Sequence, residues 1–99
     1  MLFRSAHAAG VKIFGATIMA FEGSPDYTAE GEADRQAVNT FIRTSGAFDG
    51  LVDFDAATRD PAHPARLRAD LESDGHLHPN DAGYCAMGDS IDLSLFKSR

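Results

Sequence analysis

The sequence predicts about half of an open α/β sandwich built on a short parallel sheet. Two short apolar runs, residues 11–18 and 51–55, have the length and composition of buried strands. A helical pattern lies between them, over about residues 28–45. A strand, a helix and a second strand at this spacing form a βαβ unit, so we expect the two strands to run parallel.

The chain of 99 residues has the size of a single domain, residues 1–99. Its net charge of −6 argues against nucleic acid as a partner, because phosphate binding needs a basic surface. No apolar run reaches the roughly 18 residues of a membrane span. The first ten residues do not resemble a secretory signal, so the sequence does not assign a compartment. Nothing in the sequence calls for a cofactor.

The segments on either side of the first apolar run have contrasting compositions. Residues 2–9 are rich in helix formers and stop at Gly10, so they predict the last turns of a helix whose beginning is missing. Residues 19–27 contain a Gly-Ser-Pro-Asp run, which predicts a loop. We therefore expect the chain to be a truncated part of a longer domain.

The middle helix has a recognisable start, end and apolar side. Thr28 is a suitable N-cap, and Gly46 ends the pattern. The acidic first turn suits the helix dipole and predicts a solvated face. Five residues at helical spacing form one apolar stripe, which predicts the packed face of the helix. They are Ala33, Ala37, Val38, Phe41 and Ile42.

The second half of the chain predicts a long connection followed by a helix. Residues 56–79 hold three prolines and many charges, with one helical turn expected around residues 65–71. The last helix is expected to start at Asn80 or Asp81, both good caps. Its packed face is expected to hold Tyr84, Met87, Gly88, Ile91 and Leu95. Two strands make a poor sheet, so we expect missing sequence or a homo-oligomer to complete it.

The segment with the strongest chemical signal is Ser73 to Tyr84, SDGHLHPNDAGY. Pro79 disfavours helical angles at the preceding residue, which places His78 in extended backbone just before a helix. The positive end of that helix favours a neutral imidazole, as a general base requires. Asp74, four residues earlier, can turn back to the imidazole and fix its tautomer.

The sequence DGHLHPNDAGY, followed by AM-x-DSIDLSLF, resembles the C-terminal block of SGNH/GDSL hydrolases, a family of lipases and esterases. In that block an Asp-x-x-His-Pro segment supplies two members of a catalytic triad. The runs VKIFGATI, FEGSPDY and LVDFDAATRDP also resemble the last third of bacterial members. The resemblance implies a partial three-layer α/β/α (flavodoxin-like) sandwich, and the chain corresponds to the C-terminal third to half of such a domain.

The resemblance implies that His78 is the general base activating a serine for acyl transfer from a small acyl ester. It assigns Asp74 the role of orienting acid, although the family's Asp lies three residues before the His, where this chain has Gly75. The Gly-Asp-Ser nucleophile block and the oxyanion-hole residues are not recognisable in this chain.

Gly88-Asp89-Ser90 spells a similar block, but it lies inside the last helix. Ser90 is therefore about 15 Å along that helix from its start. His78 would have to approach the serine hydroxyl to about 3 Å, so it cannot activate Ser90 of the same chain.

Two alternatives to an active esterase remain open. The first is a catalytically inactive, oligomerising remnant of that fold. The second is a metal-binding domain. The metal site would use His63, His76, His78 and Asp74, but His-x-His is a weak zinc signature, and the sequence favours no metal.

Several other polar residues have simpler explanations than catalysis. Cys85 is expected on the buried face of the last helix, and as the single cysteine it excludes an intrachain disulfide. Asp53 and Asp55 are expected to satisfy loop amides. His76 is expected to face solvent, and no Gly-x-Ser-x-Gly elbow surrounds Ser24.

Overall fold

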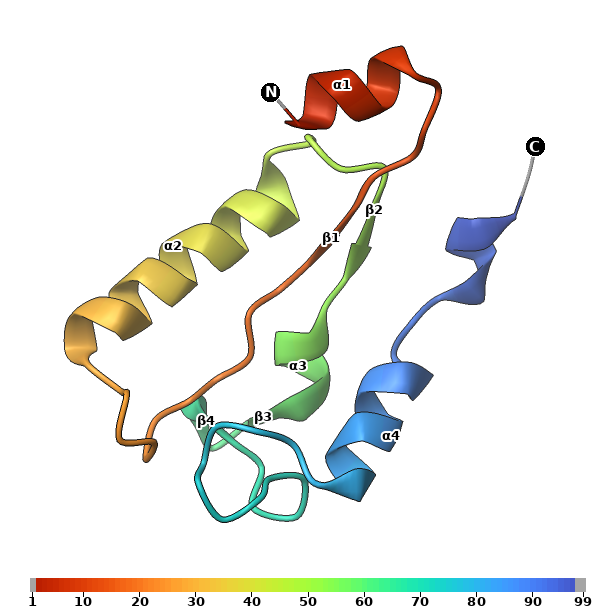
Figure 1. The fold of residues 1–99 in the computed structure, drawn as a ribbon. Coiled ribbons are helices and arrows are strands. Elements are labelled where there is room, and N and C mark those ends of the chain that lie inside the picture. Colours follow the sequence, from red (N-terminus) through yellow and green to blue (C-terminus); the bar gives the residue numbers. More distant parts are fainter. Residues whose placement is uncertain (1, 98–99) are drawn as a thin grey trace.

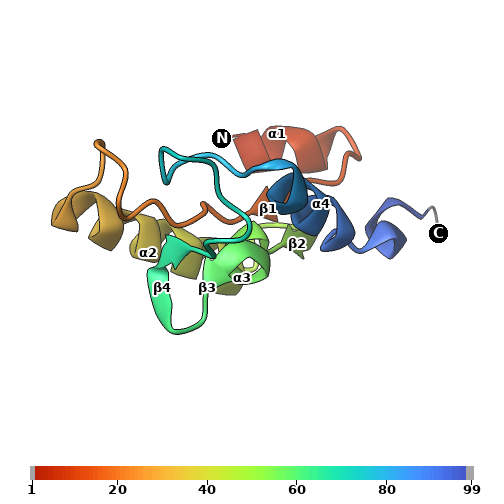
Figure 2. The ribbon, with the colours of Figure 1, turned by 90° about the horizontal axis from the view of Figure 1, so that it is seen from below.

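The computed structural model describes residues 2–97 of the chain. It is a flat α/β arrangement, 41 × 29 × 19 Å in extent. Helix α2 lies on one side of a two-stranded parallel sheet, and α1 and α4 lie on the other (Figures 1 and 2). The elements in chain order are α1 (Leu2–Ala8), β1 (Phe14–Ala16), α2 (Ala29–Thr44), β2 (Gly50–Val52), α3 (Phe54–Thr58), β3 (Arg59–Asp60), β4 (His63–Leu67), α4 (Asp81–Asp89) and η1, a 3-10 helix (Leu93–Phe96).

The central βαβ unit agrees with the sequence. Strands β1 and β2 pair in parallel, with Gly15 opposite Leu51. The hydroxyl of Thr28 accepts from the Gly31 amide at the start of α2, as expected of an N-cap. Gly46 follows the end of α2 with a positive φ of 73°, a conformation that glycine adopts readily. The predicted α/β class and parallel connection are thus confirmed.

Both strands are shorter than expected. The first apolar run forms a strand only over Phe14–Ala16. The second strand ends at Val52, because Asp53 begins a helix: its carboxylate accepts from the Ala56 amide at 3.0 Å. The prediction of a strand reaching Asp55 was therefore wrong, since a side-chain cap competes with the extended conformation.

The connection after α3 is also different from the expectation. A small antiparallel hairpin, β3 with β4, stands where a helical turn was expected. The Asp60 carboxylate accepts from the Ala62 amide at 2.9 Å and closes the turn between the two strands.

The predicted last helix is interrupted. It ends at Asp89, and the Asp92 side chain caps the separate helix η1 by accepting from the Ser94 amide at 2.9 Å. The expected continuous face is therefore divided between two helices, and two of its members, Tyr84 and Gly88, are exposed.

Helix α2 packs through its polar side, which reverses the sequence prediction. Arg35 and Asn39, one turn apart, are its buried residues. In the expected apolar stripe, Val38 is 42% exposed and Phe41 is 49% exposed. Ile42 is the exception, because its side chain lies against the backbone of Gly15 in β1. Phe41 also makes an edge-to-face contact with the ring of Phe48. Four of the five residues of the stripe, all except Ile42, are nevertheless exposed.

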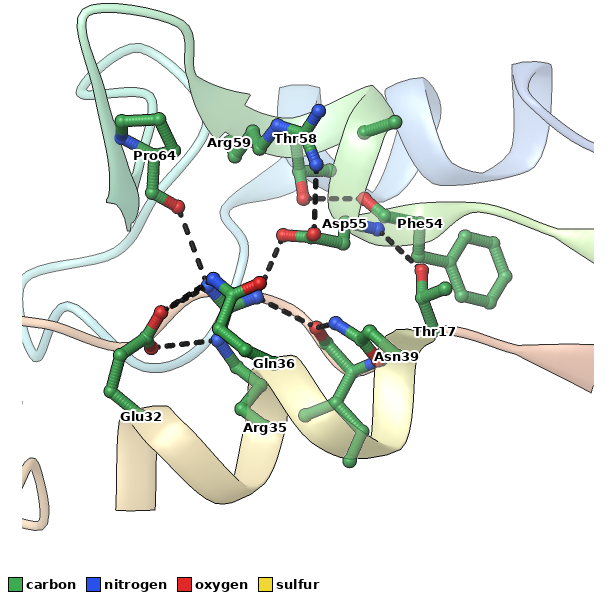
Figure 3. Close-up of polar contacts among 12 residues, drawn as sticks. Thr17, Glu32, Arg35, Gln36, Asn39, Phe54, Asp55, Thr58, Arg59 and Pro64 are labelled. Carbon is green, nitrogen blue, oxygen red and sulfur yellow. Dashed lines mark hydrogen bonds and ion pairs between the residues drawn. The ribbon is translucent and has the colours of Figure 1, made fainter. Parts of the chain in front are cut away.

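The buried side of α2 is held by an ion-pair network around Asp55 (Figure 3). The Arg35 guanidinium donates to Asp55 Oδ1 at 2.8 Å and to both carboxylate oxygens of Glu32 at 2.8 Å. It also donates to the Ile18 carbonyl at 3.0 Å. Asn39 binds both backbone groups of Ile18, so α2 is fixed to the chain just after β1.

The other oxygen of Asp55 binds two more arginines. Arg43 and Arg59 each donate to Asp55 Oδ2 at 2.9 Å. Arg43 also donates to both oxygens of Asp53 at 2.9 Å, and the hydroxyl of Thr17 donates to Asp53 Oδ1 at 2.8 Å. The Ile18 carbonyl, just after β1, and the Asp53 carboxylate, just after β2, are therefore both bound by arginines of this network.

The apolar core is small. The buried hydrophobic residues are Ala20, Val52, Leu67 and Leu71. The buried polar or charged residues are Thr17, Ser24, Arg35, Asn39, Asp55 and Thr58. The fold therefore depends on satisfied polar groups as much as on apolar burial, and a buried polar group that loses its partner is costly.

We expect Asp55→Asn to lower the free energy of unfolding by about 3–5 kcal/mol, because it removes the buried negative charge that Arg35, Arg43 and Arg59 share. Urea unfolding followed by circular dichroism measures the change. Asp70→Asn is the matched control, since Asp70 pairs with Arg68 on an exposed surface. The control is expected to cost at most about 1 kcal/mol. Equal effects of the two changes would contradict a structural role for the network.

The same network predicts a loss of stability in acid. Hydrogen bonds from Arg43 hold the pKa of the Asp53 carboxyl well below its ordinary value, and hydrogen bonds from Arg35 lower the pKa of Glu32. A carboxyl with a lowered folded-state pKa contributes stability above its unfolded pKa and loses it as the pH falls. Urea midpoints are thus expected to be constant above about pH 5 and to fall below about pH 4. A flatter profile is expected for Asp53→Asn; an identical profile would contradict this account.

Candidate functional site

The candidate site is the His78 loop, which we define as residues 72–79 between β4 and α4. Its two ends lie together, because Glu72 and Pro79 form an isolated antiparallel bridge. The amide of Asn80 donates to the Leu71 carbonyl at 2.9 Å just outside that bridge. The loop is therefore closed at its base, and only its tip is free of strand-like pairing.

The backbone of His78 is fixed from across the loop. Both the amide and the hydroxyl of Ser73 donate to the His78 carbonyl, at 2.9 and 3.0 Å. The side chain of His78 is exposed. Helix α4 begins three residues later, after the N-cap Asn80, as the sequence predicted. His78 thus combines a restrained backbone with an accessible imidazole near a helix N-terminus.

Asn80 joins the helix start to the base of the loop. Its carbonyl oxygen accepts from the Gly83 amide at 2.9 Å, which caps α4. Its amide group donates to the carbonyls of Asp70 and Glu72, each at 3.1 Å. The capping role was visible in the sequence, but the two contacts to the preceding segment were not. One side chain therefore sets the position of α4 relative to the loop.

Gly83 allows α4 to approach the loop closely. A Cβ at this position would meet the Leu71 carbonyl and the Pro79 side chain at less than the closest normal contact distance. Gly83 is buried, whereas Gly88 in the same helix has nothing within 4 Å of a Cβ. Glycine is therefore required at position 83, where α4 meets the loop, and is not required at position 88.

The structure does not join the two predicted site residues. Asp74 is exposed, and among residues 2–97 no hydrogen bond links it to His78. The carboxylate–imidazole pair of the loop is instead Glu72 with His76, whose Nδ1 lies 2.9 Å from Glu72 Oε1. Glu72 could not be identified from the sequence, because its separation of four residues from His76 indicates a contact only once the loop is folded.

His76 was expected to face solvent, but the loop half-buries it. Its ring lies close to the backbone of Gly23, on the loop that follows β1. Its φ of 57° is unusual for a residue with a side chain. If Nδ1 donates to Glu72, Nε2 is left as the acceptor, which is the tautomer of a general base. The orienting geometry expected for His78 is therefore present at His76.

Other candidate side chains have clear surroundings. Cys85 is exposed, so the prediction of a buried helix-face cysteine was wrong. The hydroxyl of Ser90 donates to the Met87 carbonyl at 2.7 Å at the end of α4. Ser24 is buried, and its hydroxyl accepts from the Asp26 amide at 3.1 Å. The hydroxyl groups of both serines therefore make local hydrogen bonds.

The histidines proposed as metal ligands are dispersed. His63 lies 2.8 Å from Glu22, and His76 is paired with Glu72. Within the described range there is no group of three or more His, Cys, Asp or Glu residues placed to hold a metal ion. Nor does that range include a helix long and apolar enough to cross a membrane. Two pockets of the structure are lined by other residues: Ala56, Ala57, Arg59, Pro61 and Arg68 in one, and His7, Gly10, Val11, Lys12 and Asp49 in the other.

Comparison with known proteins identifies the class. The model of the GDSL-like lipase/acylhydrolase family matches residues 1–86, which include the His78 loop and the start of α4. The chain belongs to this family. A comparison with curated proteins finds no match. The resemblance noted in the sequence is thus confirmed at the level of the hydrolase family.

Substitutions at the two glycines of α4 test how the loop is positioned. Gly83→Ala is expected to lower the free energy of unfolding by about 1–3 kcal/mol, because the new methyl group forces α4 away from Leu71. Gly88→Ala is the matched control and is expected to be neutral or to stabilise by up to about 1 kcal/mol, through helix propensity. Chemical denaturation measures both. A Gly83→Ala chain as stable as Gly88→Ala would show that the close approach is absent.

Proposed function

We propose that the chain takes part in ester hydrolysis by serine-type acyl transfer to water, with His78 as the general base. The single observation that carries the proposal is the His-Pro-Asn-Asp segment of a GDSL-family chain, held at the start of α4 with its imidazole exposed. Asp74 is the proposed orienting acid. Its exposure and its neighbouring Gly75 leave it free to turn toward His78 when the site is complete.

The proposed reaction needs groups that this chain does not identify. His78 would take the proton from a serine hydroxyl as that oxygen attacks the acyl carbonyl, and would return it to the leaving alcohol. A water molecule would then release the acid from the acyl-enzyme by the same base. The serine and the oxyanion donors would come from polypeptide beyond residues 2–97, which would also complete the three-layer sandwich.

His76 is the competing base, and it provides a control within the same loop. Glu72 orients His76, whereas His78 has an exposed ring and the position next to Pro79 that the family motif requires. His76 and His78 are two residues apart in the same loop. Replacing either one with alanine removes one imidazole from that loop. A comparison of their alanine variants therefore assigns the base.

We expect residues 1–99, joined to the polypeptide that supplies the serine and the oxyanion donors, to hydrolyse 4-nitrophenyl acetate above the buffer rate. His78→Ala is expected to lower kcat by at least about 100-fold, the usual contribution of a general base. Release of nitrophenolate measures both. Turnover that does not exceed buffer would overturn the proposal for this chain and favour an inactive member of the family.

His76→Ala and Asp74→Asn complete the experiment. His76→Ala is expected to retain most of the turnover, and Asp74→Asn to lose part of it, because an orienting carboxylate acts through the histidine. Loss of activity in His76→Ala with retention in His78→Ala would assign the base to the Glu72–His76 pair instead. Circular dichroism of each variant checks that the fold is unchanged.

A further inference from the structure

The dipeptide Asp-Gly occurs twice in the chain, as Asp49-Gly50 and as Asp74-Gly75. It is the sequence in which aspartate isomerises most readily, because glycine has no Cβ to obstruct attack by its own amide nitrogen on the preceding side chain. The first pair lies at the start of β2 and the second in the loop between β4 and α4, and Figure 1 shows these two segments at opposite ends of the molecule. The structure gives the two pairs different surroundings.

Asp49-Gly50 is held on both sides of its peptide bond. The Asp49 amide donates to the Ile13 carbonyl, and Asp49 Oδ2 accepts from the Ile13 amide, both at 2.7 Å. His7 Nε2 lies 2.8 Å from the same oxygen. The hydrogen bonds from Ile13 and His7 hold the pKa of the Asp49 carboxyl below its ordinary value, and an ionised carboxylate resists attack by a nucleophile. Gly50 is paired with Phe14 of β1, so its nitrogen cannot turn toward Asp49 without breaking the sheet.

Asp74-Gly75 forms the tip of the His78 loop. The two residues are the centre of a turn, which the His76 amide closes by donating to the Ser73 carbonyl at 3.2 Å. Both are exposed, and within residues 2–97 no hydrogen bond reaches the Asp74 carboxylate or the Gly75 amide. A Cβ at Gly75 would meet nothing within 4 Å. The carboxyl carbon and the nitrogen that react in isomerisation are therefore not restrained by neighbouring groups.

We propose that Asp74-Gly75 is a site of spontaneous isomerisation to isoaspartate, and that the fold protects Asp49-Gly50 from the same reaction. The Gly75 nitrogen forms a bond to Asp74 Cγ and loses its proton, and the carboxyl hydroxyl leaves with that proton as water. The product is a five-membered succinimide ring. A water molecule then opens the ring at the backbone carbonyl of Asp74, which leaves the chain running through Cβ and Cγ. One water leaves and one returns, so the mass of the chain is unchanged.

Isomerisation changes the His78 loop between two points that are held in place. The main chain gains one atom between Asp74 Cα and the Gly75 nitrogen, so the turn between Ser73 and His76 no longer has the spacing of a β-turn. The carboxylate that remains is attached directly to Cα, which shortens its reach toward His78. The loss of reach matters only if the proposed function is correct, whereas the isomerisation itself does not depend on that function.

Ageing of the purified chain tests the proposal. Samples are incubated for weeks at neutral pH and physiological temperature, folded in buffer or unfolded in urea. They are then denatured and digested with a protease that cleaves before aspartate but not before isoaspartate. In buffer we expect a progressive loss of cleavage before Asp74, with no change in mass, and full cleavage before Asp49. In urea we expect losses at both positions, because unfolding removes the hydrogen bonds that hold Asp49. Methylation by an isoaspartyl methyltransferase identifies the product.

Gly75→Val is the matched variant. Gly75 lacks a positive φ and has open surroundings, so a side chain fits there, while a β-branched side chain obstructs the approach of the nitrogen. The variant is expected to keep the circular dichroism spectrum and full cleavage before Asp74 throughout the incubation.

Three results would overturn the proposal. The first is full cleavage before Asp74 in the folded sample after ageing. The second is an equal loss at Asp49 and Asp74 in the folded sample, because the fold would then not protect Asp49. The third is an undiminished loss in Gly75→Val. Each measurement is chemical, so none depends on whether the chain hydrolyses an ester.

Discussion

The structure depends on the charge of Asp55. This carboxylate is 1% exposed, and its oxygens accept hydrogen bonds from three arginines on two segments of the chain. A buried carboxylate is stable only when it is paired and fully hydrogen-bonded, so the surrounding elements must present those arginines. Arg35 and Arg43 are eight residues apart on one side of α2, which is why that side faces inward. The short helix α3 carries Asp55 itself, and its start at Asp53 limits β2 to three residues.

An inward polar side of α2 has a consequence for its apolar residues. A helix that presents Arg35, Asn39 and Arg43 to its own chain must turn Val38 and Phe41 elsewhere. In an isolated domain such an arrangement leaves apolar area in water, at a cost of roughly 25 cal/mol per Å². The buried network and the exposed apolar residues therefore both follow from the orientation of α2 about its own axis.

The sequence predicted the elements that local signals determine. Thr28, Gly46 and Asn80 mark helix ends through contacts within a few residues, and all three have the expected positions. The orientation of α2 could not be predicted, because an apolar stripe normally indicates the packed side. Only tertiary contacts reveal that Asp55, twenty residues from Arg35, reverses this preference. The hairpin of β3 and β4 was missed for a related reason, since its charged residues gave no alternation of apolar and polar side chains.

In the candidate site, too, some features follow from residues adjacent in sequence and others from contacts across the folded loop. The position of His78 follows from neighbours in sequence: Pro79 excludes the helix, Asn80 caps α4, and Ser73 holds the His78 carbonyl. Orientation of an imidazole is different, because it requires a carboxylate at one nitrogen. In this loop Glu72 meets that requirement for His76, and the positive φ of His76 is part of the turn that allows it. The family motif has its aspartate three residues before the histidine, whereas this chain has Asp74 and Gly75. This difference changes which imidazole a carboxylate of the loop can reach. The choice between His76 and His78 as the base therefore depends on the geometry of the loop as well as on the motif.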